Sequence, residues 1–575
     1  MNDDPRYTID YHEKTKHSQA SVLYSRHYLD WNNRPNPFKV YLDLPSHLLP
    51  SSFPIPSMNA ISAISSKVDG LDLTPGEKQK QNSRPVSRSD YQYLKLSDLS
   101  SILFFSCGIT RYVKFDSGSY YMRAASATGA LYPIEVYIIT TDLHDDKLDA
   151  GIYHFNPGEF SLISIRHGDY RKILSSISGN NKSIRNSPIS LVFTSNAWRN
   201  AWKYQSRSYR HWFWDTGVIV ANLLAVSKSM GINTRLIMGF IDDQANRLLG
   251  LETHKEASIL IAPVGISSLN QNKNVNSESH LLNPQGNSSS SIEPLVHKTY
   301  PLSQKENFYP EIWRAYDSSK LVDNKEVALW SKIHRFDKTN NKIEQGKERK
   351  WYLLKQPSSK GLKNDLDIGH VILKRGSSRR FSNLSIPLDT LANILINSSE
   401  LGGNIPIDYK PDHSSLIEFY VLVNSVEGLQ SGGYYFNISS QSLDFLKDIP
   451  TENFSGHLCL DQSLFANASV VIFLMTDLKI VLDTLGNRGY RAAQLEAGII
   501  AGKIYLLSYA LGIGASGSTF YDDEVNDFFC PHDKQKATMI AIGVGVPSYR
   551  SKSGSILPVR LSREQILSYN SNTFY

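Results

Sequence analysis

Short runs of β-branched and aromatic residues recur at distant places in the chain. EVYIIT begins at Glu135 and EFYVLV begins at Glu418, and both compositions are typical of β-strands. GIYHFN from Gly151 and GGYYFN from Gly432 indicate a turn that leads into a further strand. The apolar runs ILIAPVG and IAIGVGVP predict closing strands. The pattern therefore predicts two sets of strands, one in each half of the chain.

Two longer segments carry small and apolar residues at helical spacing over about 20 positions. RSYRHWFWDTGVIVANLLAVSKSMGI begins at Arg207, and RGYRAAQLEAGIIAGKIYLLSYALGI begins at Arg488. The segments contain Gly231 and Gly512 near their ends, as helices with a glycine C-cap do. Each half is therefore predicted to be an α+β layer with one long buried helix.

The two halves repeat each other. The long segments are offset by 488 − 207 = 281 residues, and Tyr209 with Tyr490 and Gly217 with Gly498 keep this offset. GFIDDQAN and TFYDDEVN agree at an offset of 520 − 240 = 280, measured at their phenylalanines. A simpler explanation of this similarity is that the helices and strands of protein cores have similar sequences in general. Four related blocks in the same order favour a tandem duplication.

Composition divides the rest of the chain. Residues 267–295 are rich in Ser and Asn, which indicates a loop or linker, and residues 309–335 have a helical pattern. We predict an N-terminal extension with a first domain over 1–266, a linker with a connecting helix over 267–365, and a second domain over 366–575.

The bulk properties argue against several classes of protein. The net charge of +6 is small and spread along the chain, so it does not favour nucleic acid, although it suits an anionic cofactor or substrate. The three cysteines, Cys107, Cys459 and Cys530, form no CxxC pair, which argues against a zinc site or a disulfide framework. The polar N-terminus and the lack of a long apolar run predict neither a signal peptide nor a membrane span, and hence a cytoplasmic location.

Two segments are candidates for ligand binding. Residues 375–381 (RGSSRRF) place arginines around serines, so guanidinium groups and a hydroxyl could bind one phosphate. Residues 123–133 (RAASATGALYP) are small, which allows a backbone to approach a flat ligand and to offer its N–H groups to ring acceptors. Taken alone, the first segment is also explained by a solvated loop and the second by a tight turn.

Two further segments flank the long helices. Lys203 and Tyr204, at the head of the first long helix, are a candidate proton acceptor and donor. Their counterparts in the second half are Thr484 and Leu485, so one half keeps protic groups and the other does not. The plainer interpretation of the pair is a helix start with a surface lysine. Residues 512–518 (GIGASGS) offer backbone without large side chains, as a ligand-facing loop does.

Together these segments resemble the nitroreductase superfamily, and more closely its SagB-type azoline oxidases. The phosphate motif of the family, RRSxRxF, matches at Arg375, Ser377, Arg379 and Phe381, with Gly376 in place of the second arginine. The motif KYxxRxYR, whose Lys-Tyr pair is catalytic in azoline oxidases, matches KYQSRSYR. DYHEKTKHS near the N-terminus resembles the YHExTKHS opening of this branch. The resemblance covers most of residues 8–265 and 366–550.

The flavin-facing motif of the family, RxxPSxGxLxP, matches with two departures. It matches at Arg123, Gly129, Leu131 and Pro133, but Ser126 stands for the proline and Ala127 for the serine, so one hydroxyl is lost and a backbone contact is left. The resemblance implies FMN as the cofactor, with Lys203 and Tyr204 as catalytic residues. The residues implied in cofactor binding are Arg375, Ser377, Arg379, Ser126, Ala127, Thr128, Gly129, Gly514, Ser516, Gly517, Arg550 and Lys552.

The resemblance gives the duplication a meaning. Nitroreductase-like enzymes are homodimers with FMN at the subunit interface, where one subunit supplies the phosphate motif and the glycine loop and the other supplies the flavin-facing strand. Here the first half has the flavin-facing segment and the Lys-Tyr pair, and the second half has the phosphate motif and the glycine loop. We therefore expect an α+β fold of two tandem FMN-dependent nitroreductase-like domains that form an intrachain pseudo-dimer with one working FMN.

The function implied by the resemblance is FMN-dependent oxidation of azoline rings to azoles in a ribosomally made, modified peptide. Two alternatives stay open. One is an NAD(P)H-dependent reductase of nitro or quinone compounds, or a dehydrogenase of another small natural product. The other is a non-catalytic peptide-binding scaffold. We expect a peptide or small-molecule substrate, a cyclodehydratase complex as a candidate partner, no metal, and either a monomeric pseudo-dimer or a homodimer.

Overall fold

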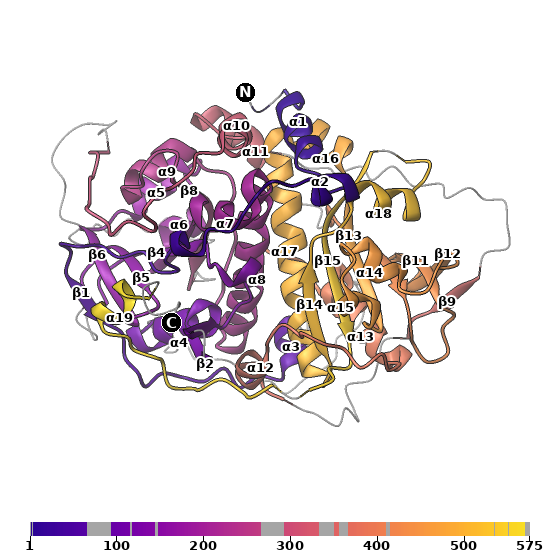
Figure 1. Ribbon diagram of the computed structural model, residues 1–575. Helices are drawn as coiled ribbons and strands as arrows, with labels where there is room; N and C mark the ends of the chain where they lie inside the picture. Colours follow the sequence, from indigo (N-terminus) through magenta and orange to yellow (C-terminus); the bar gives the residue numbers. More distant parts are fainter. Residues whose placement is uncertain are drawn as a thin grey trace, which may run out of the picture.

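The chain folds into two α+β halves that lie side by side (Figure 1). The computed structural model describes residues 2, 4–65, 94–115, 118–143, 148–265, 292–332, 350–355, 366–409, 414–533, 535–549 and 551–569. Two long helices, α8 (Ser208–Ser229) from the first half and α17 (Asn487–Ala510) from the second, pack against each other between the halves (Figure 1).

Each half contains one antiparallel sheet. The strand orders are β1-β6-β5-β4-β7-β8 and β14-β15-β13-β10-β11-β12-β9, in which β6-β5-β4-β7-β8 and β12-β11-β10-β13-β15 are equivalent. The first sheet consists of β1 (Ser46–Leu48), β4 (Ile134–Thr140), β5 (Gly151–Asn156), β6 (Ser161–His167), β7 (Ile189–Asn196) and β8 (Glu256–Val264). The second consists of β9 (Trp351–Leu353), β10 (Glu418–Val423), β11 (Gly432–Asn437), β12 (Ser442–Lys447), β13 (Val470–Asp477), β14 (Gly514–Ser518) and β15 (Lys536–Gly545).

Helices and one hairpin complete the two halves. The hairpin is β2 (Ile109–Phe115) with β3 (Gly118–Arg123). Helices before the linker are α1 (Arg6–Lys14), α2 (Gln19–Leu23), α3 (Ala60–Ile64), α4 (Leu96–Cys107), α5 (Arg171–Ile177), α6 (Lys182–Asn186), α7 (Ala197–Tyr204) and α9 (Asp242–Leu249). The later ones are α10 (Pro310–Ser318), α11 (Asn324–Ser331), α12 (Ile368–Lys374), α13 (Leu388–Ser398), α14 (Phe454–Leu458), α15 (Ser463–Ala466), α16 (Leu478–Leu485), α18 (Asp522–Phe529) and α19 (Arg563–Leu567).

The structure confirms most of the predicted elements. The six predicted strands and both long helices are present, and Gly231 and Gly512 follow the helices with φ of 69° and 80°. The helical pattern of 309–335 corresponds to α10 and α11. The Ser/Asn-rich segment lies mostly outside the described residues. The prediction for residues 514–518 is wrong: they form the edge strand β14, not a loop, because they pair with β15.

Glycines set the closest approach of the two long helices. A Cβ added to Gly217 would lie 2.5 Å from the carbonyl carbon of Gly498 and from the backbone nitrogen of Ile499. A Cβ added to Gly498 would lie 2.8 Å from the Cα of Trp214. Since these neighbours are backbone atoms, no side-chain rotation can make room. The pair Gly217 and Gly498, equivalent in the repeat, therefore allows the helices to touch directly.

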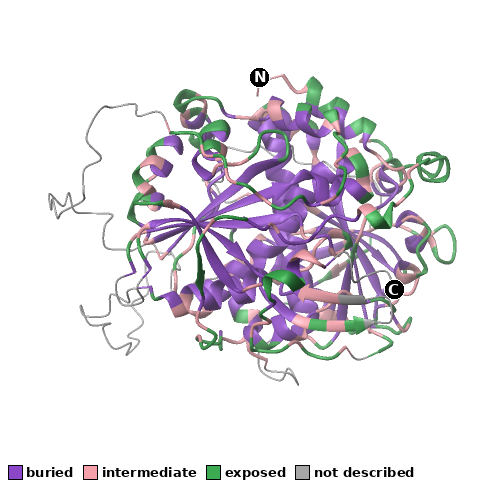
Figure 2. Cartoon of the chain, turned by 60° about the vertical axis from the view of Figure 1, so that its left-hand side comes forward, coloured by how far each residue is buried: buried purple, intermediate pink, exposed green. Residues whose placement is uncertain are grey.

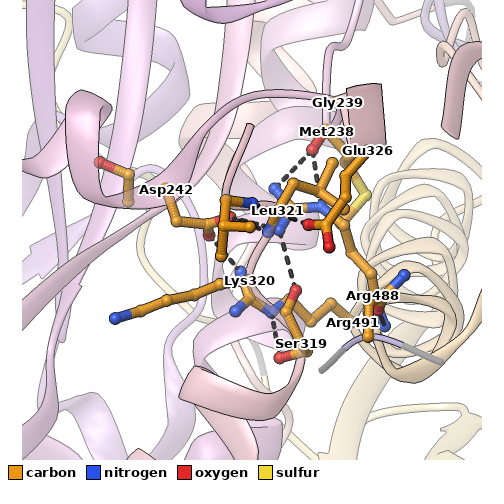
Figure 3. A network of polar contacts seen from close by, with 12 residues as sticks. Met238, Gly239, Asp242, Ser319, Lys320, Leu321, Glu326, Arg488 and Arg491 are labelled. Atoms are coloured by element: carbon orange, nitrogen blue, oxygen red, sulfur yellow. Dashed lines mark hydrogen bonds and ion pairs between the residues drawn. The ribbon is translucent and has the colours of Figure 1, made fainter. Parts of the chain in front are cut away.

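Buried ion pairs join the head of each long helix to the opposite half. Asp242, at the start of α9, binds Arg488 and Arg491 of α17 at 2.7 Å each (Figure 3). Asp522, at the start of α18, binds Arg207 at 2.9 Å and Arg210 at 2.8 Å. These two arginine–aspartate clusters are related by the repeat, so each half holds the other in the same way.

Each cluster also binds backbone groups of a further segment of the chain, residues 12–17 in one cluster and residues 316–321 in the other. In one cluster, Arg210 donates to the carbonyl of His12 at 2.9 Å, and the His17 N–H donates to Asp522 at 2.8 Å. In the other, Arg491 donates to the carbonyl of Tyr316 at 2.7 Å, and the Leu321 N–H donates to Asp242 at 2.9 Å. The segment around α10, which the sequence suggested was a connecting helix, is thus the structural counterpart of the N-terminal segment around α1.

Burial follows the same plan. Figure 2 shows buried residues concentrated along the sheets and the long helices, and every residue of α17 is buried. The N-terminal arm lies against the second half, where Lys16 pairs with Asp523, and the C-terminal α19 lies against the first half, where Ile566 packs with Phe38. None of the helices among the described residues has the length and apolar character needed to cross a membrane.

We expect Gly217→Ala to destabilise the protein by about 1–3 kcal/mol, as overpacking of a core does. Helix propensity alone favours alanine by about 1 kcal/mol, so a loss of stability isolates the clash with α17. Denaturant unfolding measures the change. Gly376→Ala is the control, since a Cβ there has its nearest neighbour at 3.6 Å. Equal stability of the Gly217 variant and the wild type would contradict the direct helix contact.

We expect Asp242→Asn to cost about 3–5 kcal/mol, because Arg488 and Arg491 remain buried without a counter-charge. Burial raises the pKa of Asp242, but the two arginines outweigh burial and hold that pKa below its ordinary value. Its stabilisation is therefore complete above about pH 4 and is lost as the pH falls further. Unfolding curves at pH 7 and pH 3 should show a smaller difference for the variant than for the wild type. An equally acid-sensitive variant would count against this account.

Candidate active site

A cavity of about 760 Å³ opens between the two halves. Its walls come from the β2–β3 hairpin and the segment that follows it, from α7 and α8 of the first half, and from residues 375–379, α17 and β14 of the second half. Of the candidate residues, the cavity is lined by Ser126, Ala127, Thr128, Gly129, Lys203, Tyr204, Arg375, Ser377, Arg379, Ser516 and Gly517. The fold thus brings together segments that lie up to about four hundred residues apart in the chain.

Arg375 ties the second half to the flavin-facing segment of the first. Its side chain is buried, with Nε donating to the carbonyl of Ala124 at 3.0 Å and Nη2 donating to that of Arg123 at 3.2 Å. Burial lowers the pKa of Arg375. The sequence suggested that this guanidinium would serve a phosphate. In the structure it joins two walls of the cavity and lies among the lining residues.

Ser377 and Arg379 continue this wall. The hydroxyl of Ser377 lies 3.4 Å from that of Tyr505, and Tyr505 also accepts the N–H of Gly517 at 2.6 Å. Tyr505 therefore connects the 375–379 segment to β14. Arg379 is exposed, and its backbone N–H donates to the Tyr549 hydroxyl at 2.9 Å.

A buried carboxylate, that of Asp215, binds the segment 126–130. Asp215 of α8 accepts the Thr128 N–H at 2.9 Å and the Thr128 hydroxyl at 2.7 Å. Burial raises the pKa of Asp215 to about 7, and the bonds from Thr128 oppose this rise. This N–H is therefore already used within the protein. Gly129 follows with φ of 64°, a conformation that favours glycine.

Lys203 and Tyr204 end α7 and do not begin the long helix, contrary to the sequence prediction. Gln205, with a φ of 49°, interrupts the helical conformation between α7 and α8. Tyr204 reaches across to the flavin-facing segment, where its hydroxyl would lie 2.7 Å from a Cβ on Gly129. The absence of a side chain at Gly129 thus makes room for Tyr204.

The surroundings of Lys203 and Tyr204 shift their pKa values in opposite directions. Partial burial, together with the nearby charges of Arg379 and Arg34, lowers the pKa of Lys203. Burial, with a smaller effect of Asp215, raises the pKa of Tyr204. The lysine is therefore the better proton acceptor of the pair, and the tyrosine stays protonated as a hydrogen-bond donor.

Two candidate residues, Gly514 and Lys552, are not among the described residues that line the cavity, and the position of a third is not described. Gly514 packs on the 375–379 segment, because a Cβ there would lie 2.1 Å from the hydroxyl of Ser378. Lys552 is exposed and is not among the lining residues. Arg550 lies outside the described residues. The basic residues near the C-terminus thus gain no support from the geometry of the described chain.

The cavity also has lining residues that the sequence interpretation missed. They include Arg111 from the hairpin, His211 and Asp215 from α8, and Leu460 from the α14–α15 connection. Asp215 carries a signal in the sequence, as a lone carboxylate within the apolar run HWFWDTGVIV. His211 and Asp215 are also four residues apart, which places them on one helix face. The positions of Arg111 and Leu460 follow from the fold alone.

The equivalent position on the opposite side of the pseudo-dimer is closed by the protein itself. By sheet register Leu236 corresponds to Gly517, since Ile237 faces Ile261 as Ser518 faces Ala541. The Leu236 N–H donates to the carbonyl of Pro406 at 2.8 Å. The segment before β10 therefore lies directly on the strand-like segment that matches β14, whereas a cavity separates the corresponding walls on the other side.

Further contacts fill this closed position. The Asp408 carboxylate accepts the N–H groups of Met238 at 3.1 Å and Gly239 at 2.8 Å. The Trp330 ring of α11 would lie 2.6 Å from a Cβ on Gly239. Glu496, which corresponds to Asp215, accepts the Leu416 N–H at 3.2 Å. The duplication therefore gives two equivalent positions: among the described residues, one is a cavity of about 760 Å³ and the other is largely filled, with a pocket of about 10 Å³ beside Glu496.

Comparison with known proteins agrees with this architecture. A model of the nitroreductase family matches residues 90–266 and again residues 372–546. A nitroreductase-type protein of Methanocaldococcus jannaschii, MJ1384, is 27% identical over 172 residues, which are 30% of this chain and 81% of that protein. McbC of Escherichia coli, a microcin B17-processing protein, is 26% identical over 142 residues, which are 24% of this chain and 52% of McbC. This chain thus matches about half the length of McbC.

A solved structure shows the same tandem fold. A nitroreductase-type protein from Anabaena variabilis superposes with a TM-score of 0.68 at 24% identity, over 94% of this chain and 99% of that one. The family model matches both halves in turn, and the repeat, the sheets and the composite cavity account for both matches. This chain belongs to the nitroreductase family, as a tandem form that carries both domains of an oxidoreductase pseudo-dimer in one polypeptide.

Proposed function

We propose that this chain is an FMN-dependent dehydrogenase that oxidises azoline rings to azoles in a ribosomally made, modified peptide. The observation that carries the proposal is the one-sided cavity, in which Lys203 and Tyr204 share walls with residues 375–379 and β14. The packed position has Thr484 and Leu485 at the places of Lys203 and Tyr204. The similarity to McbC, named for processing microcin B17, supports a peptide substrate. A cyclodehydratase is the class of enzyme that makes such rings.

The cavity suits FMN in size and charge. Its volume of about 760 Å³ lies in the range of cofactor sites, roughly 300–1,000 Å³. Among the described lining residues Asp215 is the one acidic side chain, and the basic ones are Arg111, Arg123, Lys203, Arg375 and Arg379. This excess of positive charge suits a phosphate group. Ser377 and Arg379 would hold the phosphate, and the 126–129 segment and Gly517 would lie against the ring.

The chemistry divides between the cofactor and the protein. Bound FMN would supply the hydride acceptor for the substrate ring. Lys203 takes the proton that leaves the neighbouring carbon, since its lowered pKa increases its neutral fraction. Tyr204 donates a hydrogen bond from its hydroxyl and is held by the space at Gly129. Asp215 fixes the Thr128–Gly129 turn on which Tyr204 rests.

A second candidate is an NAD(P)H-dependent reductase of nitro or quinone compounds. The extensive match to the M. jannaschii protein, 81% of its length, favours this class. Anaerobic addition of NADPH distinguishes the two functions. Rapid loss of the flavin absorbance would support the reductase, and an unchanged spectrum supports the dehydrogenase.

We expect the double variant Lys203→Met with Tyr204→Phe to lose at least about 100-fold in turnover of a thiazoline-containing peptide, as general acid–base residues do. Mass spectrometry follows the loss of two hydrogens from the peptide. FMN content should stay at the wild-type level, because the phosphate side of the cavity is unchanged. Thr484→Ala, at the place equivalent to Lys203, is the matched control and should keep full activity. A fully active double variant would remove the pair from the mechanism.

We expect the purified protein to release one FMN per chain, counted by absorbance after denaturation. Gly517→Leu should abolish flavin binding, because it gives the cavity the side chain that its counterpart Leu236 has in the packed position. Leu236→Met is the control and should leave the count at one. Two FMN per chain would contradict the single site. No FMN, even after its addition, would favour the scaffold interpretation.

A further inference from the structure

The connection between α14 and α15 presents one apolar side chain to the cavity. Leu460 lines the cavity, and both Leu460 and Asp461 have left-handed backbone conformations, with φ of 60° and 55°. Such conformations are uncommon for residues other than glycine, and they cost free energy when a Cβ is present. Two in succession require a surrounding structure that fixes them, and they are found most often at functional sites.

Several contacts fix this connection. The Asp461 carboxylate accepts the Tyr521 hydroxyl at 2.7 Å and lies 2.8 Å from Nδ1 of His457. The Gln462 amide donates to the carbonyl of Cys459 at 2.7 Å and to the Ser518 hydroxyl of β14 at 3.1 Å. The position of Leu460 is therefore set by α18 and β14, and its own side chain is not needed to hold the turn.

The N-terminal strap, residues 19–27, relates Leu460 to the proposed catalytic pair. At one end Gln19 lies 3.4 Å from the imidazole of His457, and at the other His27 lies 2.9 Å from the carbonyl of Trp202, next to Lys203. The eight Cα–Cα steps from residue 19 to residue 27 span at most about 28 Å when extended. The strap thus connects the helix that precedes the Leu460 turn, in the second half, with the end of α7, in the first half, and Leu460, Lys203 and Tyr204 all line the same cavity. Arg375 of the second half, by contrast, donates to the carbonyls of Arg123 and Ala124 in the first half.

We propose that Leu460 is a specificity-determining residue, which limits the size of the ring that reaches Lys203 and Tyr204. A glycine at this position would adopt the same φ without strain, so the side chain contributes its apolar surface to the cavity and not the shape of the turn. An aliphatic side chain in the same cavity as two protic groups suits a flat, apolar ring that presents one acidic C–H bond. This inference rests on the proposed function, since it assumes that a reacting ring enters the cavity.

The test compares how two quinones of different size reoxidise the flavin. The FMN-loaded protein is reduced with dithionite under anaerobic conditions, and the return of flavin absorbance is followed after mixing with benzoquinone or naphthoquinone. The readout is the ratio of the two rate constants, naphthoquinone over benzoquinone. We expect Leu460→Gly to raise this ratio about tenfold, the scale on which a pocket discriminates small apolar groups. Leu460→Ala should raise it as well.

The matched control is Gln441→Gly. Gln441, in the turn between β11 and β12, has a similar φ of 51° and is not among the cavity's lining residues. Both glycine variants relieve a left-handed residue, so neither should lower the midpoint of thermal unfolding. Only the Leu460 variants should change the ratio.

An unchanged ratio in Leu460→Gly and Leu460→Ala, with normal flavin content, would overturn the inference and leave the proposed function intact. An equal rise in Gln441→Gly would also overturn it, since backbone strain and not the cavity wall would then be the cause. A protein that takes up no FMN would overturn the proposed function, and the inference with it.

Discussion

Two buried carboxylates hold the molecule together at the heads of its long helices. Asp242 and Asp522 each bind two arginines from the opposite half, and burial of these charges is tolerated because every ion has a partner. With the heads fixed, the contact of Gly217 with Gly498 sets how closely α8 and α17 approach. Because α8 and α17 both contribute walls to the cavity, their close approach also constrains the position of those walls.

The duplication separates residues that serve the fold from residues that serve the site. The arginine–aspartate clusters and the paired glycines occur in both halves, and the carboxylates of Asp215 and Glu496 each hold a hydrogen-bonded turn. Lys203 and Tyr204 occur once, opposite the 375–379 segment, which also lines the cavity. The second position is used for packing, as the contacts of Asp408 and Trp330 with Gly239 show.

The errors of the sequence interpretation have physical causes. Residues 201–210 (AWKYQSRSYR) contain no glycine or proline to mark the end of a helix, so the sequence could not show that Gln205 interrupts the helix with a left-handed φ. The glycines of 512–518 suggested a loop, but pairing with β15 makes them a strand, and tertiary hydrogen bonds override local composition. The segment around α10 shares little with the N-terminal motif beyond Ser319 and Lys320, whose side chains contact Arg491 and Asp243 as those of Thr15 and Lys16 contact Arg210 and Asp523. Two matching residues are too few to reveal the relation from the sequence.

The sequence by itself determined the duplication, the strands, the two long helices and the residue types that the cavity gathers, because these depend on local periodicity and on repeated spacing. It also showed that the two halves differ at the proposed catalytic pair, since Thr484 and Leu485 replace Lys203 and Tyr204 in the second half. Only the tertiary structure decided that Arg375 bonds to backbone carbonyls, that Asp215 supports the Thr128 turn, and that the second position is closed. These features arise from contacts between residues far apart in the chain, and neither their distances nor their burial is encoded in a short window of sequence.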